Sequence, residues 1–220
     1  MKLLCLGDSL TDCGRLFDAP PLGSGYVHFL SDLLNTPPAG SNTDILHQEN
    51  QKQSWEVRNL GVDGFTVARL LENAPGRYLG VPADLITILI GINDIGLMMN
   101  TDRTKTQKDT MMQAFFQKYD QLLRILSTKR VPVLLMEPFL FPCPAEYLSW
   151  FPLAEEMSQG ISCLAKKYSC PYLLLHRDFN ERYRESLPHS LTTEGIHLTE
   201  AGHRILAHKV YDCICRLNLV

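Results

Sequence analysis

The sequence predicts a three-layer α/β domain in which helices cover both faces of a parallel sheet. Two observations lead to this prediction. Short apolar runs alternate five times with longer amphipathic segments, and the apolar runs are hydrophobic almost throughout. Continuous hydrophobicity is typical of parallel strands that are buried on both faces. Because 220 residues suit one sizeable domain, we expect residues 1–220 to form a single unit.

Five strands are expected from the apolar runs. The clearest covers residues 85–90, which are rich in β-branched side chains and lie between Asp84 and Gly91. The other expected strands cover residues 3–6, 56–60, 131–136 and 172–175. A sheet of about five strands follows.

Amphipathic spacing predicts helices between these strands. Apolar residues recur every three or four positions in each helical segment, as expected for a helix with one buried face. The expected helices cover residues 26–34, 67–74, 112–126, 153–168 and 199–217. Thr66 is the expected N-cap of the second helix, and the pair Pro75-Gly76 should end it.

Two stretches interrupt the alternation. Residues 36–54 are polar and are expected to form a long surface loop or insertion. Residues 139–152 are rich in proline and aromatic side chains and follow the fourth expected strand. Loops beyond the carboxyl ends of parallel strands line ligand crevices, so this loop either contacts substrate or simply packs against the domain. The aromatic side chains that could contact acyl chains or sugar rings are Phe141, Tyr147, Trp150 and Phe151.

Composition excludes several classes of protein. The net charge of −3 and the pI near 6.2 argue against a general binder of nucleic-acid backbones. No apolar run approaches the ~20 residues of a membrane span, and no secretory signal is visible, so we expect a cytoplasmic protein. Seven scattered cysteines without a CxxC pair predict neither a disulfide framework nor a zinc site.

Chemically useful residues follow the ends of several expected strands. Ser9 follows the first strand, where a helix start would favour developing negative charge. Gly61 and Gly64 follow the second strand, and Asn93 follows the third, where its uncharged amide could hold an oxyanion. Taken singly, the segments of Ser9 and of the two glycines are better explained as an ordinary helix cap and a turn, and that of Asn93 is equally well explained as a turn. The incomplete GxGxxG pattern excludes a dinucleotide site.

A carboxylate and an imidazole lie together near the C-terminus. Glu194 precedes His197 by three residues, just before the last expected helix. A carboxylate at this spacing can accept the imidazole Nδ1–H, which leaves Nε2 to take a proton from a serine. Of the other histidines, His189, His203 and His208 lack this arrangement.

Together these segments resemble the SGNH/GDSL hydrolase superfamily. The sequence has GDSL at residues 7–10, NxGxxGxT at residues 59–66, GxND at residues 91–94 and an acid-x-x-His at residues 194–197. The four blocks occur in the family's order and span nearly the whole chain. The resemblance implies a flavodoxin-like α/β/α sandwich and ester hydrolysis without metal or organic cofactor, on a small-molecule ester.

The resemblance also assigns roles to individual residues. Ser9 is the expected nucleophile and His197 its general base and acid. The expected oxyanion hole consists of the Ser9 and Gly64 backbone N–H groups and the Asn93 amide, with Gly64 favoured over Gly61 by its spacing to the following Thr. Glu194 stands where the family usually has Asp. Its longer side chain either orients His197 or misses it and leaves that task to a backbone carbonyl.

Several alternatives remain open at this stage. A carbohydrate O-acetylesterase, a lysophospholipase and a thioesterase would use the same residues. A non-catalytic binding protein would retain the blocks as turns, and a phosphate or flavin binder would use the glycine-containing loop over residues 7–14. The sequence does not specify the oligomeric state.

Overall fold

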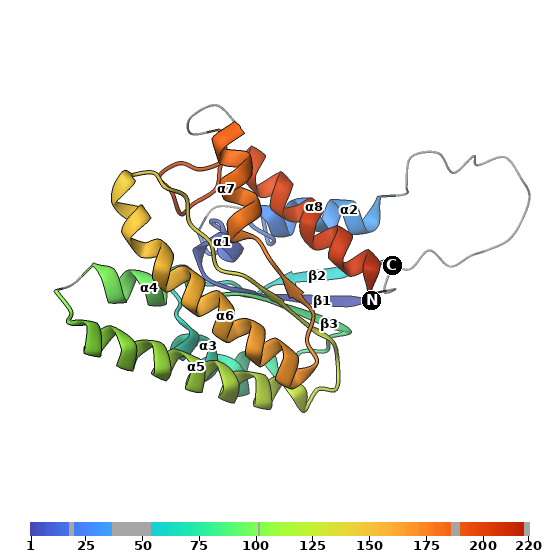
Figure 1. Cartoon of the computed structure of the whole chain (residues 1–220). Helices are drawn as coiled ribbons and strands as arrows, with labels where there is room; N and C mark the ends of the chain where they lie inside the picture. The colour runs from blue at the N-terminus through green and yellow to red at the C-terminus, as the bar shows by residue number, and fades with distance from the viewer. Residues whose placement is uncertain (18–19, 37–53, 101, 186–189, 218–220) are drawn as a thin grey trace, which may run out of the picture.

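Five strands pair in parallel to form one sheet, in the order β2-β1-β3-β4-β5 (Figure 1). The structure is a computed structural model, and it describes residues 1–17, 20–36, 54–100, 102–185 and 190–217. The strands are β1 (Lys2–Gly7), β2 (Glu56–Asn59), β3 (Leu85–Leu89), β4 (Val133–Met136) and β5 (Tyr172–Leu173). All five predicted strands are therefore present, and this strand order is that of flavodoxin-like folds.

Helices cover both faces of the sheet (Figure 1). One face is covered by α3 (Val67–Asn73), α5 (Lys105–Ser127) and α6 (Phe151–Tyr168), and the other by α2 (Tyr26–Asn35), α7 (His176–Glu185) and α8 (Glu200–Arg216). Two short helices follow strands directly: α1 (Ser9–Asp12) follows β1, and α4 (Ile92–Met99) follows β3. The predicted three-layer α/β/α architecture is confirmed.

The alternation of side chains along β1 shows why helices must cover both faces of the sheet. Leu4 and Leu6 pack into the apolar cluster on the α5 side, whereas Leu3 and Cys5 pack into the cluster on the α8 side. Successive side chains of a strand point to opposite faces, so a strand that is apolar throughout must be buried on both. The carboxyl ends of the strands are left uncovered for other uses.

Two helices were not predicted. The α4 helix begins just after β3, at the segment over residues 91–94 for which the sequence offers either an oxyanion-holding amide or an Asn-Asp turn. The α7 helix is mostly charged, and His176, Phe179 and Asn180 are its buried residues. The usual apolar repeat is absent from it, because two of these three side chains are polar.

The predicted end of the α3 helix is wrong. The chain stays helical through Pro75 and Gly76 in a π-helical segment, η1 (Ala74–Tyr78), which closes with a bond from the Leu79 N–H to the Ala74 carbonyl. Proline has no N–H for the regular α-helical ladder, and the wider turn accommodates this loss while Ala74 and Tyr78 stay fully buried.

The predicted loop over residues 139–152 is only partly a loop. Its second half forms a 3-10 helix, η2 (Ala145–Trp150), and α6 starts at Phe151. Phe139 and Phe141 are fully buried and pack their rings on Phe179 of α7. Most of the other predicted loop, residues 36–54, lies outside the described residues.

Candidate active site

Ser9 is the first residue of the α1 helix, directly beyond the end of β1. Asp8 caps this helix, because its side chain accepts a hydrogen bond of 3.1 Å from the Leu10 N–H. The predicted position of Ser9 at a helix start is therefore confirmed. Helix starts present free N–H groups, which favour negative charge on nearby atoms.

His197 and Ser9 are separated by 188 positions and lie in hydrogen-bond contact. The Ser9 Oγ atom is 2.9 Å from His197 Nε2. On its other side, His197 Nδ1 is 2.6 Å from Glu194 Oε1. An ionised carboxylate only accepts hydrogen bonds, so Nδ1 carries the proton and Nε2 is left as an acceptor for the serine hydroxyl. The three side chains thus form a continuous chain of hydrogen bonds.

Glu194 is held in place by its own neighbours. Its Oε1 also accepts the backbone N–H of His197 at 2.8 Å, and the Thr193 hydroxyl donates to Oε2. Partial burial acts to raise the pKa of Glu194, but these hydrogen bonds and the neighbouring imidazole outweigh it and lower that pKa overall. The carboxylate is thus kept ionised. The extra methylene of Glu, compared with Asp, does not prevent contact with His197.

Gly195 shapes the turn that carries these two residues. Its φ is 100°, and a Cβ there would lie 1.8 Å from the Cys143 carbonyl oxygen. Only glycine fits a positive φ with so close a backbone neighbour. Its carbonyl accepts the Phe141 N–H at 2.8 Å, which fixes the Glu194–His197 turn to the segment after β4.

The predicted oxyanion donors follow β1, β2 and β3. The Asn93 amide donates a 2.9 Å hydrogen bond to the carbonyl of Phe65, the neighbour of Gly64, so one amide hydrogen remains for another acceptor. Gly64 has a φ of 72° and is exposed. Within the residues that the structure describes, its N–H has no hydrogen-bond partner. The Val62 N–H donates to the Gly7 carbonyl at 3.1 Å and fastens this segment to the end of β1.

Gly61 is placed quite differently from Gly64. It is buried, and a Cβ at this position would lie 2.5 Å from the backbone nitrogen of Asp12 in α1. Its carbonyl accepts a 2.5 Å hydrogen bond from Arg15. Gly61 therefore permits the close approach of two backbones, whereas Gly64 faces open space. This contrast agrees with the preference for Gly64 as the donor.

Asn59 has a bracing role that the sequence did not reveal. It is buried, and its amide donates to the carbonyls of Thr11 at 2.6 Å and Leu22 at 2.7 Å. Its oxygen accepts the Gly61 N–H at 3.0 Å. One side chain thus joins the serine helix to the glycine segment. The block at residues 59–66 signalled this position, but its letters do not disclose what the side chain contacts.

Two buried carboxyl groups, those of Asp8 and Asp94, are sequence neighbours of Ser9 and Asn93. Burial raises the pKa of Asp8 to about 7 although the Leu10 N–H opposes this, and the nearby Asp94 adds to the rise. Burial likewise raises the pKa of Asp94 to about 7, against the hydrogen bond that it accepts from the Val67 N–H. Through this bond Asp94 caps the N-terminus of α3. Thr66, the predicted N-cap, occupies the N-cap position, but its side chain makes no capping hydrogen bond.

The aromatic residues after β4 divide between packing and the site. Phe141 is buried in the core, so of the two alternatives for this loop, packing holds at this position. Tyr147 lies beside the triad: a Cβ on Gly195 would be 2.8 Å from its ring. Burial raises the pKa of Tyr147, and the charge of Glu194 adds to this rise. Trp150 is buried against Tyr147, with ring centroids 4.5 Å apart.

Another histidine lies buried close to the candidate site. His203 of α8 accepts the Tyr26 N–H at Nδ1, and its Nε2 is 3.5 Å from the Cys13 sulfur. Burial lowers the pKa of His203 to about 4, and His197 adds to the effect. His203 thus stays neutral and joins α2 to α8. His189 lies outside the described residues.

The described part of the chain shows no metal-binding cluster, no disulfide and no helix able to cross a membrane. In the described ranges no three His, Cys, Asp or Glu side chains are grouped closely enough to hold a metal ion. None of the cysteines in this part of the chain forms a disulfide. Among those same ranges, every helix is too short or too polar to cross a membrane.

Comparison with known proteins identifies relatives of this chain. The chain is 28% identical to the acetylxylan esterase of Geobacillus stearothermophilus over 94% of its own length and 90% of the relative. A crystal structure of an acetylxylan esterase from that organism matches with a TM-score of 0.77 at 24% identity, covering 96% of this chain and 92% of the other. A lipase candidate of the GDSL-like type from Parabacteroides merdae also gives 0.77, at 23% identity and 96% and 94% coverage. These two structures support the fold.

The family itself follows from a match over most of the sequence. The family model described as GDSL-like Lipase/Acylhydrolase matches residues 5–205, which include all four sequence blocks. Such a span leaves only the ends of the chain unmatched. The chain belongs to the GDSL-like lipase/acylhydrolase family and is an ester hydrolase.

Proposed function

We propose that this chain is a serine esterase that removes small acyl groups, above all acetyl, from the hydroxyls of carbohydrates. The continuous contact from Ser9 through His197 to Glu194 is the observation that most strongly supports the serine mechanism. The substrate class is supported by the acetylxylan esterase to which the chain is similar over nearly its full length. No cofactor is needed for this chemistry.

The proposed reaction proceeds in two steps through an acyl-enzyme. The Ser9 oxygen attacks the ester carbonyl while His197 Nε2 takes the hydroxyl proton, forming a tetrahedral intermediate. His197 then gives this proton to the departing sugar hydroxyl as the C–O bond breaks. Water attacks the acyl-serine and loses a proton to His197. His197 then returns this proton to the Ser9 oxygen as the acyl C–O bond breaks, which releases acetic acid and restores the Ser9 hydroxyl.

Stabilisation of the oxyanion is assigned to three donors. The N–H groups of Ser9 and Gly64 and the free hydrogen of the Asn93 amide would hold the negative oxygen of the intermediate. A single donor of this type is typically worth about 3–4 kcal/mol of transition-state stabilisation. Support comes from the open position of Gly64 and from the bond between Asn93 and Phe65, which brings the amide next to the glycine segment.

Acetate release from O-acetylated xylo-oligosaccharides, followed by NMR, tests the substrate class. We expect turnover by the wild type and a loss of roughly 10⁴-fold or more in Ser9→Ala. Ser149→Ala is the matched control, since this exposed serine only bonds the Glu146 carbonyl within its own helical turn. With p-nitrophenyl esters, acetate should be cleaved at least ~10-fold faster than octanoate.

Other outcomes of this test favour the competing substrates. Faster cleavage of octanoate would support a lysophospholipase-type enzyme, and faster cleavage of an acyl thioester would support a thioesterase. Either result would contradict the carbohydrate assignment while leaving the serine mechanism intact. Full activity of Ser9→Ala, measured on folded protein, would contradict the mechanism itself.

A further inference from the structure

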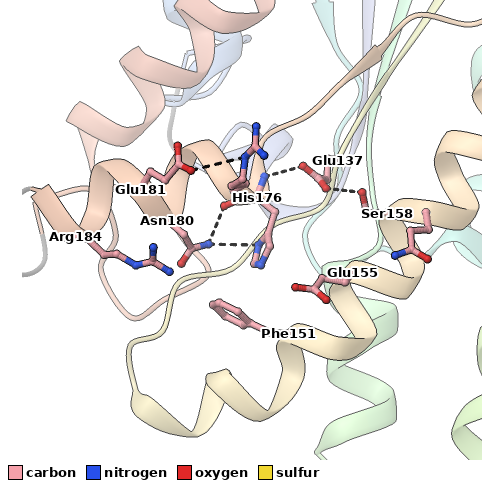
Figure 2. A pocket seen from close by; sticks show the side chains of 10 residues that line it. Glu137, Phe151, Glu155, Ser158, His176, Asn180, Glu181 and Arg184 are labelled. Atoms are coloured by element: carbon pink, nitrogen blue, oxygen red, sulfur yellow. Dashed lines mark hydrogen bonds and ion pairs between the residues drawn. The ribbon is translucent and has the colours of Figure 1, made fainter.

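A cavity separate from the candidate active site lies between α6 and α7, beyond the carboxyl end of β4 (Figure 2). Its volume is about 310 Å³, which is near the lower end for small-molecule sites. None of Ser9, Gly64, Asn93, Glu194 and His197 lines it. The side chains that the argument uses are Glu137, Phe151, Glu155, His176, Asn180 and Arg184.

Glu137 makes the floor of the cavity rigid. This buried carboxylate accepts the backbone N–H of Leu175 at 2.5 Å and that of His176 at 2.7 Å, and the Ser158 hydroxyl also donates to it. The start of α7 is thereby fixed to the end of β4 and to α6. Both oxygens of Glu137 are occupied in this way, so its role is to hold the site together.

Asn180 carries an unsatisfied acceptor in the wall of the cavity. Its side-chain amide donates to the carbonyls of Leu140 at 3.0 Å and His176 at 2.8 Å, which fixes the NH₂ group toward those two oxygens. The Oδ1 atom of the amide therefore points away from those two carbonyl oxygens. Asn180 is only 4% exposed, and this oxygen has no partner among the described residues. Leaving a buried acceptor unsatisfied costs about 1–3 kcal/mol, so a ligand hydroxyl would be favoured here.

His176 offers a donor next to that acceptor. Its Nδ1 accepts the Leu140 N–H at 3.4 Å, and burial lowers its pKa although Glu137 and Glu155 oppose the shift. A neutral imidazole with an accepting Nδ1 carries its proton on Nε2. Figure 2 shows the His176 ring and the Asn180 amide side by side, with Phe151 and Glu155 around the same space. The Asn180 nitrogen lies 3.4 Å from His176 Nδ1.

An aromatic ring and a balanced rim complete the cavity. The rings of Phe151 and His176 meet edge to face with centroids 4.7 Å apart. At the rim, Arg177 pairs with Glu181 at 3.7 Å, and Glu155 and Arg184 carry opposite charges. The rim has two carboxylates and two guanidinium groups, and the hydrogen bonds that Glu137 accepts offset its charge on the floor, so the cavity does not select for an anion or a cation. A neutral ligand with both donors and acceptors fits best.

We propose that this cavity binds one neutral sugar ring through two adjacent hydroxyl groups. One hydroxyl donates to Asn180 Oδ1, and its neighbour accepts from His176 Nε2, while the apolar C–H face of the ring packs on Phe151. Hydroxyls both donate and accept, so a vicinal pair matches the adjacent donor and acceptor. This site is distinct from the candidate active site and does not depend on the reaction proposed there.

Saturation-transfer NMR and titration with methyl β-D-xylopyranoside test the site. Enzyme whose Ser9 has been blocked with a fluorophosphonate is titrated as well, which separates this cavity from the active site. We expect binding by both forms, no binding of tetrahydropyran, which has the ring but no hydroxyls, and no competition by inorganic phosphate. Absence of sugar binding, or displacement of the sugar by phosphate, would overturn the proposal.

Two substitutions of His176 separate its two nitrogens. His176→Asn keeps an acceptor near the Nδ1 position and removes the Nε2 donor, so affinity should fall roughly 10-fold, the loss of one good hydrogen bond. His176→Gln places an amide donor near the Nε2 position and should bind within about threefold of the wild type. The opposite order, with His176→Asn binding normally, would overturn the proposal.

A second pair of variants tests the walls. Phe151→Leu keeps an apolar side chain but removes the aromatic face and should weaken binding about fivefold. Glu156→Gln is the matched control, because Glu156 is exposed on the same helix and does not line the cavity. Thermal unfolding and esterase activity check that each variant is folded. Equal binding by Phe151→Leu and the wild type would contradict the role assigned to the ring.

Discussion

Glu194 shows how an exposed side chain can hold His197, the proposed general base, in position. The side chains of Glu194 and His197 are 46% and 52% exposed, so solvent screens their mutual attraction. The geometry therefore depends on several hydrogen bonds rather than on charge alone. Thr193 and the His197 backbone N–H hold the carboxylate where its Oε1 can meet the imidazole.

Replacing Glu194 by Gln isolates the contribution of its charge. The Gln oxygen can still accept both N–H groups of His197, but it stabilises the imidazolium less. We expect kcat/KM for p-nitrophenyl acetate to fall roughly 10²-fold, which is less than for Ser9→Ala. Glu200→Gln, on an exposed residue that pairs only with Arg204, serves as the control. Unchanged turnover in Glu194→Gln would remove Glu194 from the mechanism.

Asp8 links the candidate site to the pH dependence of stability. In the unfolded chain its pKa should be near the ordinary 3.8, and in the folded protein burial raises that pKa to about 7. Between pH 4 and 7 the folded state therefore binds more protons, so the free energy of unfolding decreases as the pH rises. Below pH 4 both states are protonated and the penalty disappears.

The Asp8→Asn variant should lack this part of the pH dependence. The difference in free energy of unfolding between Asp8→Asn and the wild type should increase, in favour of the variant, by roughly 2–4 kcal/mol from pH 5 to pH 8. Urea unfolding at the two pH values measures the difference, and Asp212→Asn, on an exposed position of α8, is the control. If the free energy of unfolding changes with pH by the same amount in Asp8→Asn and in the wild type, Asp8 does not hold its proton in the folded state.

At the scale of elements, the site lies where the strand order reverses. The chain moves from β1 outward to β2 and then back past β1 to β3, and ligands bind at such switch points beyond the carboxyl ends of the strands. Ser9 follows β1 and Asn93 follows β3, so the topology itself brings them to one edge. Asn59, at the end of β2, fastens the remaining segment to them.

Asn59→Ala tests this fastening. Removing the amide leaves the buried carbonyl of Thr11 and the partly buried carbonyl of Leu22 without this donor, which should cost about 2–4 kcal/mol of stability. Because Gly64 would lose its fixed position relative to Ser9, kcat should fall more than KM changes. Asn35→Ala is a control: Asn35 makes comparable bonds to Ser31 and Trp55 at the end of α2. Equal kcat values for Asn59→Ala and the wild type would contradict the bracing role.

At the scale of the whole molecule, the sequence predicted the sheet better than the helices around it. The apolar runs predicted all five strands, because a strand buried on both faces must be apolar throughout. The α7 helix was missed because its inner face carries His176 and Asn180, whose hydrogen bonds replace the usual apolar contacts. Phe141 could not be assigned to the core because aromatic residues serve both cores and binding sites.

The same contrast holds for the candidate site. The blocks around Ser9 and His197, read through the resemblance, predicted the contact that the structure shows between these two side chains. The raised pKa values of Asp8 and Asp94 were not predictable, since burial depends on the packed structure rather than on the neighbouring residues in the sequence.

We further propose that residues 1–220 form one domain, in line with the family match over residues 5–205.

Fluorophosphonate labelling with mass-spectrometric mapping tests the central claim most directly, since the probe forms a covalent bond only with an activated serine. The account predicts a single adduct on Ser9 in the wild type and in Ser149→Ala, no adduct in Ser9→Ala, and labelling slowed roughly 10³-fold or more in His197→Ala. An adduct on a different serine, or equally fast labelling of the wild type and His197→Ala, would contradict it.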